Sequence, residues 1–123
     1  MDKDWKEFIK KAKEEYYKID RVNCPAFNNE GVFFTSSGFN HLQRKNRKLR
    51  DKNIQIRRIS LCYYAPGILK RATQFLTHYT DVDARRTRVD FWSLEGKVNG
   101  INLVVIVRQI DNHSKHFFSV FEK

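Results

Sequence analysis

The sequence predicts an α+β fold in which N-terminal helices pack on a four-stranded antiparallel β-sheet, a meander. Apolar residues recur at helical spacing in the first half of the 123-residue chain, and strand-like alternation flanks an Asn-Gly turn in the last third. This length fits a single domain, 1–123, and 41% hydrophobic residues with ten Phe can fill one core. No apolar run is long enough to span a bilayer, so we expect a soluble protein.

The first expected element is an amphipathic helix within residues 1–20. Over residues 2–18, apolar side chains follow three- and four-residue spacing: Trp5, Phe8, Ile9, Ala12 and Tyr16. Six lysines in residues 1–20 are balanced by six acids, so the whole net charge of +10 lies in residues 21–123. Residues 19–30 are expected to be irregular, because Pro25 and Asn28-Asn29 favour turns.

Residues 32–73 are predicted to be a basic helical region. After a short extended segment at 32–34, the hydroxyls of 35–37 can cap a helix over about 37–48, with Phe39, Leu42 and Leu49 inward. Residues 53–62 form another expected helix, and Pro66 suits the first turn of a helix over 66–73.

Residues 74–122 are predicted to form the sheet. Strands are expected at 75–80, 87–98, 101–110 and 116–121, with loops at 81–86 and 111–115. Asn99-Gly100 is the preferred two-residue hairpin turn, and it sets Val98 opposite Ile101 and fixes the other pairs. Two apolar pairs of one face are Trp92/Val107 and Leu94/Val105, and we expect the helix at 2–18 or 37–48 to cover that face.

The opposite face of this hairpin mixes apolar and charged side chains. It carries Phe91, Val104 and Ile106 beside Ser93, Glu95, Lys97 and Arg108. A half-buried arginine on a central strand needs an anionic partner. That partner is either Asp90 or Glu95 in an ion pair, or a phosphate held by the guanidinium.

The positive charge is densest in residues 41–58, where eight Lys and Arg face Asp51 alone. Such a cluster favours binding of a polyanion, of which nucleic acid is the commonest. On a helix over 37–48, His41 would share a face with Arg44 and Lys45. Arg44, Lys45, Arg47 and Arg50 are therefore the candidate phosphate-binding residues.

The sequence lacks the motifs of several classes of enzyme. The carboxylates do not cluster as in metal-dependent nucleases, His113 and His116 lack a second ligand pair for zinc, and no phosphate-cradling glycine loop or nucleophile elbow is present. We therefore expect no metal and no cofactor. RNA can still be cleaved by its own 2′-hydroxyl if histidine supplies acid–base catalysis and Arg or Lys stabilises the developing charge.

Three segments resemble the phage-type nucleases of the barnase–EndoU–colicin–RelE (BECR) class. They are Phe91 to Val98, Val104 to Gln109 and Lys115 to Phe121, and Gly38 to Leu42 is similar to the helix that presents a basic or imidazole side chain in that class. The resemblance covers roughly residues 32–122.

The resemblance implies helices on a four-stranded antiparallel sheet and a metal-independent ribonuclease activity. It places His41, Arg108, His116 and Ser119 in the catalytic site, with Lys97 or Lys115 adding positive charge. Members often act as toxins or as effectors of phages and mobile elements. The implied partners are RNA (tRNA or another RNA) and an inhibitor or antitoxin protein, and the expected location is the cytoplasm, without membrane association, where Cys24 and Cys62 would be free thiols.

Two alternatives stay open. A four-residue loop before the last strand places Ser119 on the Arg108 face with Phe117 and Phe121, whereas a three-residue loop places His116 opposite Arg108. The second alternative concerns function. A non-catalytic RNA- or DNA-binding module would use the same basic helix, with Tyr63, Tyr64 and Tyr79 stacking on bases.

Overall fold

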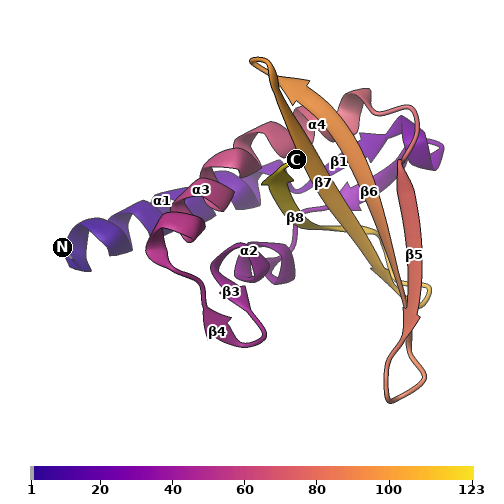
Figure 1. Cartoon of the computed structure of the whole chain (residues 1–123), viewed down its shortest axis with the longest axis horizontal. Coiled ribbons are helices and arrows are strands. Elements are labelled where there is room, and N and C mark those ends of the chain that lie inside the picture. Colours follow the sequence, from indigo (N-terminus) through magenta and orange to yellow (C-terminus); the bar gives the residue numbers. More distant parts are fainter. Residues whose placement is uncertain (1) are drawn as a thin grey trace.

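The computed structural model describes residues 2–123 and has an α+β architecture, as predicted (Figure 1). The helices are α1 (Asp2–Ile19), α2 (Ser36–Gln43), α3 (Lys52–Leu61) and α4 (Ala65–Arg71), with short 3-10 turns η1 (Pro25–Phe27) and η2 (Cys62–Tyr64). The strands are β1 (Arg21–Cys24), β2 (Glu30–Phe33), β3 (Arg44–Lys45), β4 (Lys48–Leu49), β5 (Thr77–Val82), β6 (Arg88–Val98), β7 (Ile101–Ile110) and β8 (His116–Glu122).

The main sheet has six strands in the order β1-β2-β8-β7-β6-β5, so the prediction of a four-stranded antiparallel sheet is wrong. Strands β5 to β8 are antiparallel neighbours, but β2 joins the outer edge of β8 in parallel, at Phe33 opposite His116. The error lies in residues 19–30, which were expected to be irregular. Asn28 and Asn29 do form a left-handed turn, but short strands flank it on both sides.

The β6–β7 hairpin has the predicted register at every pair, from Val98/Ile101 to Phe91/Arg108. Asn99 and Gly100 both have positive φ, as a two-residue hairpin turn requires. Trp92, Leu94, Val105 and Val107 are buried, and Lys97 is exposed. Over Gly96 the covering helix is α4, because a Cβ there would lie 2.7 Å from Ile68 Cγ1.

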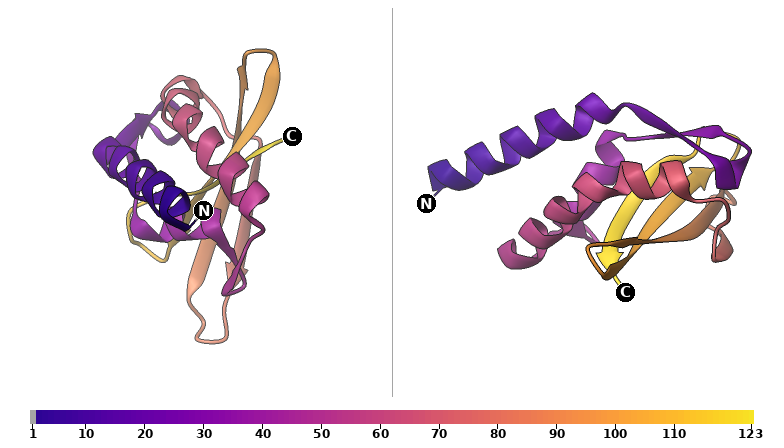
Figure 2. Two further views of the ribbon diagram at one scale, coloured as in Figure 1. Left: turned by 90° about the vertical axis from the view of Figure 1, so that its left-hand side faces the viewer. Right: turned by 90° about the horizontal axis from the view of Figure 1, so that it is seen from above.

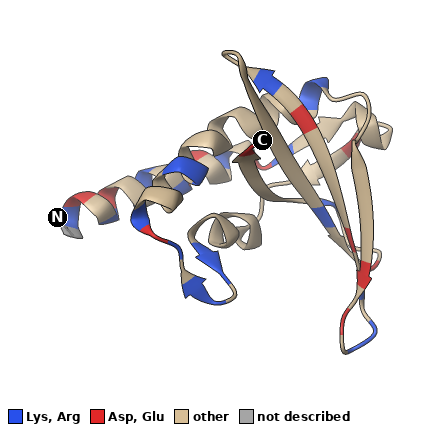
Figure 3. Ribbon diagram, viewed as in Figure 1, with Lys and Arg blue, Asp and Glu red and all other residues tan. Residues whose placement is uncertain are grey.

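The basic segment after His41 is not the helix that the sequence suggested. Helix α2 ends at Gln43, and the chain then forms the short hairpin β3–β4, whose Lys and Arg residues are coloured in Figure 3. Asn46 and Arg47 have φ of 52° and 68°, the left-handed geometry of a two-residue turn. Phe39 and Leu42 are buried as predicted, but Leu49 is 60% exposed, so its predicted inward position is wrong and it does not anchor a longer helix on the core.

The helices gather beside the sheet, and α1 runs outward at its N-terminal end (Figure 2). Its Ala12 and Tyr16 reach the core, which also contains Phe39 of α2, Ile59 of α3 and Leu69 of α4. Within residues 2–123, no helix combines the length and apolarity needed to cross a membrane. Cys24 and Cys62 are buried free thiols, as expected.

Candidate functional site

Helix α2 lies directly against strand β8. Gly38 makes this contact possible, because a Cβ there would approach Phe117 O to 2.4 Å and the Tyr16 hydroxyl to 2.6 Å. Ser37 and His41 are four residues apart, so they lie on one side of the helix. The close approach of α2 brings both of these side chains to residues of the sheet face that carries Arg108.

A β-bulge in β8 puts His116 and Ser119 on the same face of the sheet. Arg108 pairs with His116 and Ile106 pairs with Ser119, with a register shift between them. The two alternatives for the last strand exclude one another only in an uninterrupted ladder, where side chains alternate strictly between the faces, and the bulge adds one residue to β8. The pairing of Arg108 with His116 agrees with the three-residue-loop alternative. Phe117 pairs with Val107 and is fully buried, so its place on the Arg108 face in the four-residue-loop alternative is wrong.

Arg108 is bound by neutral groups rather than by a carboxylate. Its Nε donates to His116 Nε2 at 2.8 Å, its Nη2 donates to Ser37 Oγ at 2.8 Å, and its guanidinium lies 4.4 Å from the Phe118 ring centroid. The two acids that could have paired with Arg108 are occupied elsewhere: Asp90 with Arg88 and His78, and Glu95 with Lys123. In the described part of the chain, Arg108 forms no ion pair.

His41 lies between an aromatic ring and an arginine. Its imidazole stacks on Phe118 with centroids 4.0 Å apart, and its Nε2 is 3.4 Å from Arg50 Nη2. A guanidinium only donates hydrogen bonds, so the facing Nε2 carries a lone pair and the imidazole is neutral. Burial, with further contributions from Arg50, Arg58 and Arg108, lowers the pKa of His41 to about 4.

Arg58 joins this group from α3, although the sequence did not single it out. Its Nη1 donates to Ser119 Oγ at 2.8 Å, and its guanidinium lies 5.9 Å from the Phe121 ring centroid. Burial lowers the pKa of Arg50, Arg58 and Arg108 from the usual arginine value. These guanidiniums stay charged at neutral pH but are partly desolvated.

A shallow cavity of about 220 Å³ opens between these side chains. We call it the arginine pocket. Its lining residues are His41, Lys45, Arg50, Arg58, Ile106, Phe118, Ser119 and Phe121. Arg108 adjoins it by packing on Phe118. Among residues 3–123, no Asp or Glu lines this pocket, so its cations lack a protein anion. Such a pocket favours an anionic ligand.

His116 and Ser119 are both buried, with 8% and 3% of their surface exposed. Burial and then Arg108 lower the pKa of His116 to about 4, so its imidazole is also neutral near pH 7. His116 accepts from Arg108, and Ser119 accepts from Arg58. Each therefore fixes the direction of one guanidinium.

The other predicted phosphate-binding residues divide into two groups. Lys45 and Arg50 line the arginine pocket, whereas Arg44 and Arg47 are exposed and outside its lining. Two further residues lie away from it: Lys97 next to the Asn99-Gly100 turn, and Lys115, whose Nζ bonds Glu30 at 2.9 Å and lies over Phe27 and Trp92. Trp92 belongs to the core face, so Lys115 is on the wrong side of the sheet to join Arg108.

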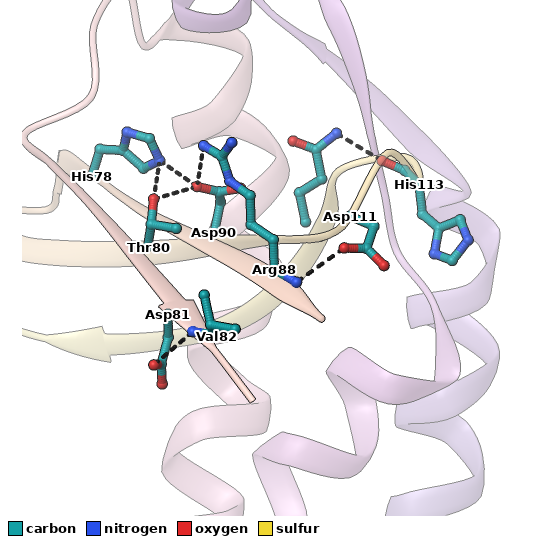
Figure 4. Close-up of polar contacts among 9 residues, drawn as sticks. His78, Thr80, Asp81, Val82, Arg88, Asp90, Asp111 and His113 are labelled. Atoms are coloured by element: carbon teal, nitrogen blue, oxygen red, sulfur yellow. Dashed lines mark hydrogen bonds and ion pairs between the residues drawn. The ribbon is translucent and has the colours of Figure 1, made fainter. Parts of the chain in front are cut away.

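A second polar cluster surrounds Asp90 on the core face (Figure 4). His78 Nε2 lies 2.7 Å and Thr80 Oγ1 2.6 Å from Asp90 Oδ1, and Arg88 Nε donates to Oδ2 at 3.0 Å. Burial alone would raise the pKa of Asp90, but hydrogen bonds from Thr80, His78 and Arg88 outweigh it and hold that pKa at about 2. These contacts tie the edge strand β5 to β6.

Asp90→Asn is expected to destabilise the protein more at about pH 7 than at about pH 2. The folded-state pKa lies below the usual aspartate value of 3.8, so the carboxylate stabilises the fold above about pH 4 and loses that effect as pH falls toward 2. The loss at neutral pH should be about 2 kcal/mol, measured by urea unfolding. An equal loss at both pH values would contradict the assigned hydrogen bonds.

Metal ligands do not converge anywhere in residues 2–123, where no group of three His, Cys, Asp or Glu side chains could hold an ion. His113, which has a zinc-like spacing from His116, is exposed, and its backbone carbonyl accepts from Gln109.

Comparison of the chain with protein-family models, curated proteins and solved structures finds no match in any of the three. The likeness to the nuclease class therefore rests on the residues of this chain, and the function has to be argued from the arginine pocket.

Proposed function

We propose that this protein is a metal-independent endoribonuclease whose active site is the arginine pocket. One observation carries the proposal: the neutral imidazole of His41 borders a pocket that contains Arg50 and Arg58 and that no Asp or Glu of residues 3–123 lines. A phosphate diester would supply the missing negative charge, and a neutral imidazole can accept a proton from a 2′-hydroxyl.

In the proposed reaction, Arg50, Arg58 and Arg108 hold the scissile phosphate and stabilise the charge that develops on it. His41 accepts the proton of the 2′-hydroxyl, whose oxygen attacks the adjacent phosphorus. The bond from phosphorus to the 5′-oxygen breaks, and that oxygen takes a proton from Lys45 or from water. The products are a 2′,3′-cyclic phosphate and a 5′-hydroxyl.

His116 and Ser119 have a different role in this proposal from the one expected from the sequence. Both are nearly buried, and each accepts a hydrogen bond from one arginine. They therefore serve as positioning residues for Arg108 and Arg58, while His41 remains the acid–base group. Their loss should weaken phosphate binding by misdirecting a guanidinium.

A second candidate function is binding of RNA without cleavage. It is favoured by the low pKa of His41, about 4, because such an imidazole is a weak base in the free protein. The two candidates share the arginines and differ in the fate of the RNA.

Incubation with an RNA and with DNA of the same sequence separates these candidates. A ribonuclease using the 2′-hydroxyl should release RNA fragments that end in a 2′,3′-cyclic phosphate and should leave DNA intact. A binding module would retain both nucleic acids without cutting either. Fragments from DNA would contradict the proposed chemistry.

Phosphate binding is expected to raise the pKa of His41 from its value of about 4. An anion in the pocket offsets the repulsion from Arg50 and Arg58, which favours the charged imidazolium. The base would then be stronger in the complex than in the free protein. NMR titration of the histidine rings with and without inorganic phosphate measures this shift, with the exposed His113 as control. An unchanged or lower pKa of His41 would argue against phosphate in the pocket.

A further inference from the structure

Two aromatic side chains continue the Arg108 face toward the edge of the sheet. Tyr79 on β5 pairs with Phe91 on β6, and Phe91 pairs with Arg108 on β7. Directly paired residues project from the same face of a sheet. Neighbouring strands are about 4.8 Å apart, so Tyr79 lies about 10 Å from Arg108 across the sheet.

We call the rings of Tyr79 and Phe91 the aromatic ledge; Tyr79 is exposed and Phe91 is half-buried. Tyr79 is 60% exposed, and its ring centroid lies 6.4 Å from that of Phe91 at 32°. Phe91 meets Phe118 edge-on at 5.4 Å. Phe118 itself is already in contact with His41 and Arg108. The ledge therefore begins where the arginine pocket ends.

This arrangement matches the alternation of charge and aromatic surface in single-stranded nucleic acid. Phosphates need cations, and every base presents a π-face that stacks on an aromatic ring. Two acids share this face of β5 and β6: Asp81, two residues beyond Tyr79, and Glu95, which pairs with Lys123 at 2.8 Å. Neither lies in the row that joins Tyr79, Phe91 and Arg108.

We infer that the aromatic ledge stacks an unpaired base of the RNA whose phosphate occupies the arginine pocket. The identity of the ligand rests on the proposed function, and the inference narrows the substrate class to single-stranded RNA. The base faces of a duplex are covered by their neighbours, so duplex RNA cannot use the ledge.

The test measures binding of 2′-O-methyl RNA, which lacks the attacking hydroxyl and cannot be cleaved by the proposed route. The same sequence is offered as a single strand and as a duplex. Tyr79→Ala should weaken single-strand binding about 5- to 150-fold, the effect of one lost base stack, and leave duplex binding unchanged. Tyr79→Phe should bind as the unaltered protein does.

Tyr17→Ala is the matched control, because Tyr17 is 47% exposed and lies on α1, outside the Arg108 face. It should bind both forms of RNA normally. Retained duplex binding by Tyr79→Ala also shows that this variant is folded. The inference is overturned if Tyr79→Ala binds the single strand normally or loses both forms equally.

The results also separate this inference from the proposed ribonuclease. If no RNA is cut but Tyr79→Ala selectively loses single-strand binding, the ledge stands and the enzyme proposal fails. If RNA is cut and Tyr79→Ala binds the single strand normally, only the ledge fails.

Discussion

Replacing His41 with alanine is expected to lower RNA cleavage by about a hundredfold to ten-thousandfold, the usual contribution of a general acid–base group. The imidazole lies 3.4 Å from Arg50 and stacks on Phe118, so it borders the site where Arg50 and Arg58 would hold a phosphate. The measurement is the cleavage rate of a labelled RNA at saturating protein. RNA affinity should change far less than the rate.

The control for this variant is His113→Ala, which removes an exposed histidine outside the pocket lining. His41 is half-buried, so its variant must also be compared with the unaltered protein in urea unfolding. A stable His41→Ala protein that cleaves RNA at the original rate would exclude His41 as the base. The non-catalytic RNA-binding function would then be the better explanation of the pocket.

Arg58→Ala is expected to slow cleavage by about a hundredfold to a thousandfold, as the loss of one donor to developing charge does in other enzymes. Arg58 lines the pocket and is directed by Ser119 at 2.8 Å. Arg108→Ala should have a similar effect, because Arg108 adjoins the pocket through Phe118.

The chain offers a closely matched control for Arg58. Its neighbour Arg57 has the same charge and lies on the same helix, but it pairs with Glu122 and is outside the lining of the arginine pocket. Arg57→Ala should therefore cleave RNA nearly normally. If both variants lose activity to the same extent, net charge rather than the geometry of the pocket controls the reaction.

The elements that could be predicted correctly are those in which the pattern of apolar and charged side chains is compatible with only one register or helix position. In the β6–β7 hairpin, a slip of one residue would bury Lys97 and Glu95, so the register could be predicted from Asn99-Gly100. Helix α4 was similarly marked by Pro66 and by Ile68 and Leu69, which are buried.

The errors arise where backbone geometry outweighs the pattern of side chains. Strand β1 has four residues and is too short to show clear alternation. The basic residues from 44 to 48 have a spacing that suits a helix. The chain instead turns at Asn46 and Arg47, where both residues have the positive φ that a helix does not allow. Strict alternation of side chains along β8 would put His116 and Ser119 on opposite faces of the sheet. Nothing in the sequence marks the bulge that puts them on the same face.

The candidate site was predictable only in part. Of the predicted residues, four line the pocket: His41, Lys45, Arg50 and Ser119. Arg108 adjoins the pocket by packing on Phe118, and His116 accepts a hydrogen bond from Arg108. Arg58 was missed as a site residue, because its place depends on how α3 packs against β8, which local sequence does not record.

Metal-independent cleavage with His41 as the base is tested most directly by RNA cleavage by the purified protein in excess chelator, beside His41→Ala purified in parallel. The parallel variant controls for contaminating ribonucleases. We expect undiminished cleavage by the unaltered protein in chelator and almost none by the variant. Loss of cleavage on chelation would contradict the proposed metal-independent chemistry, and equal cleavage by both proteins would contradict the role of His41.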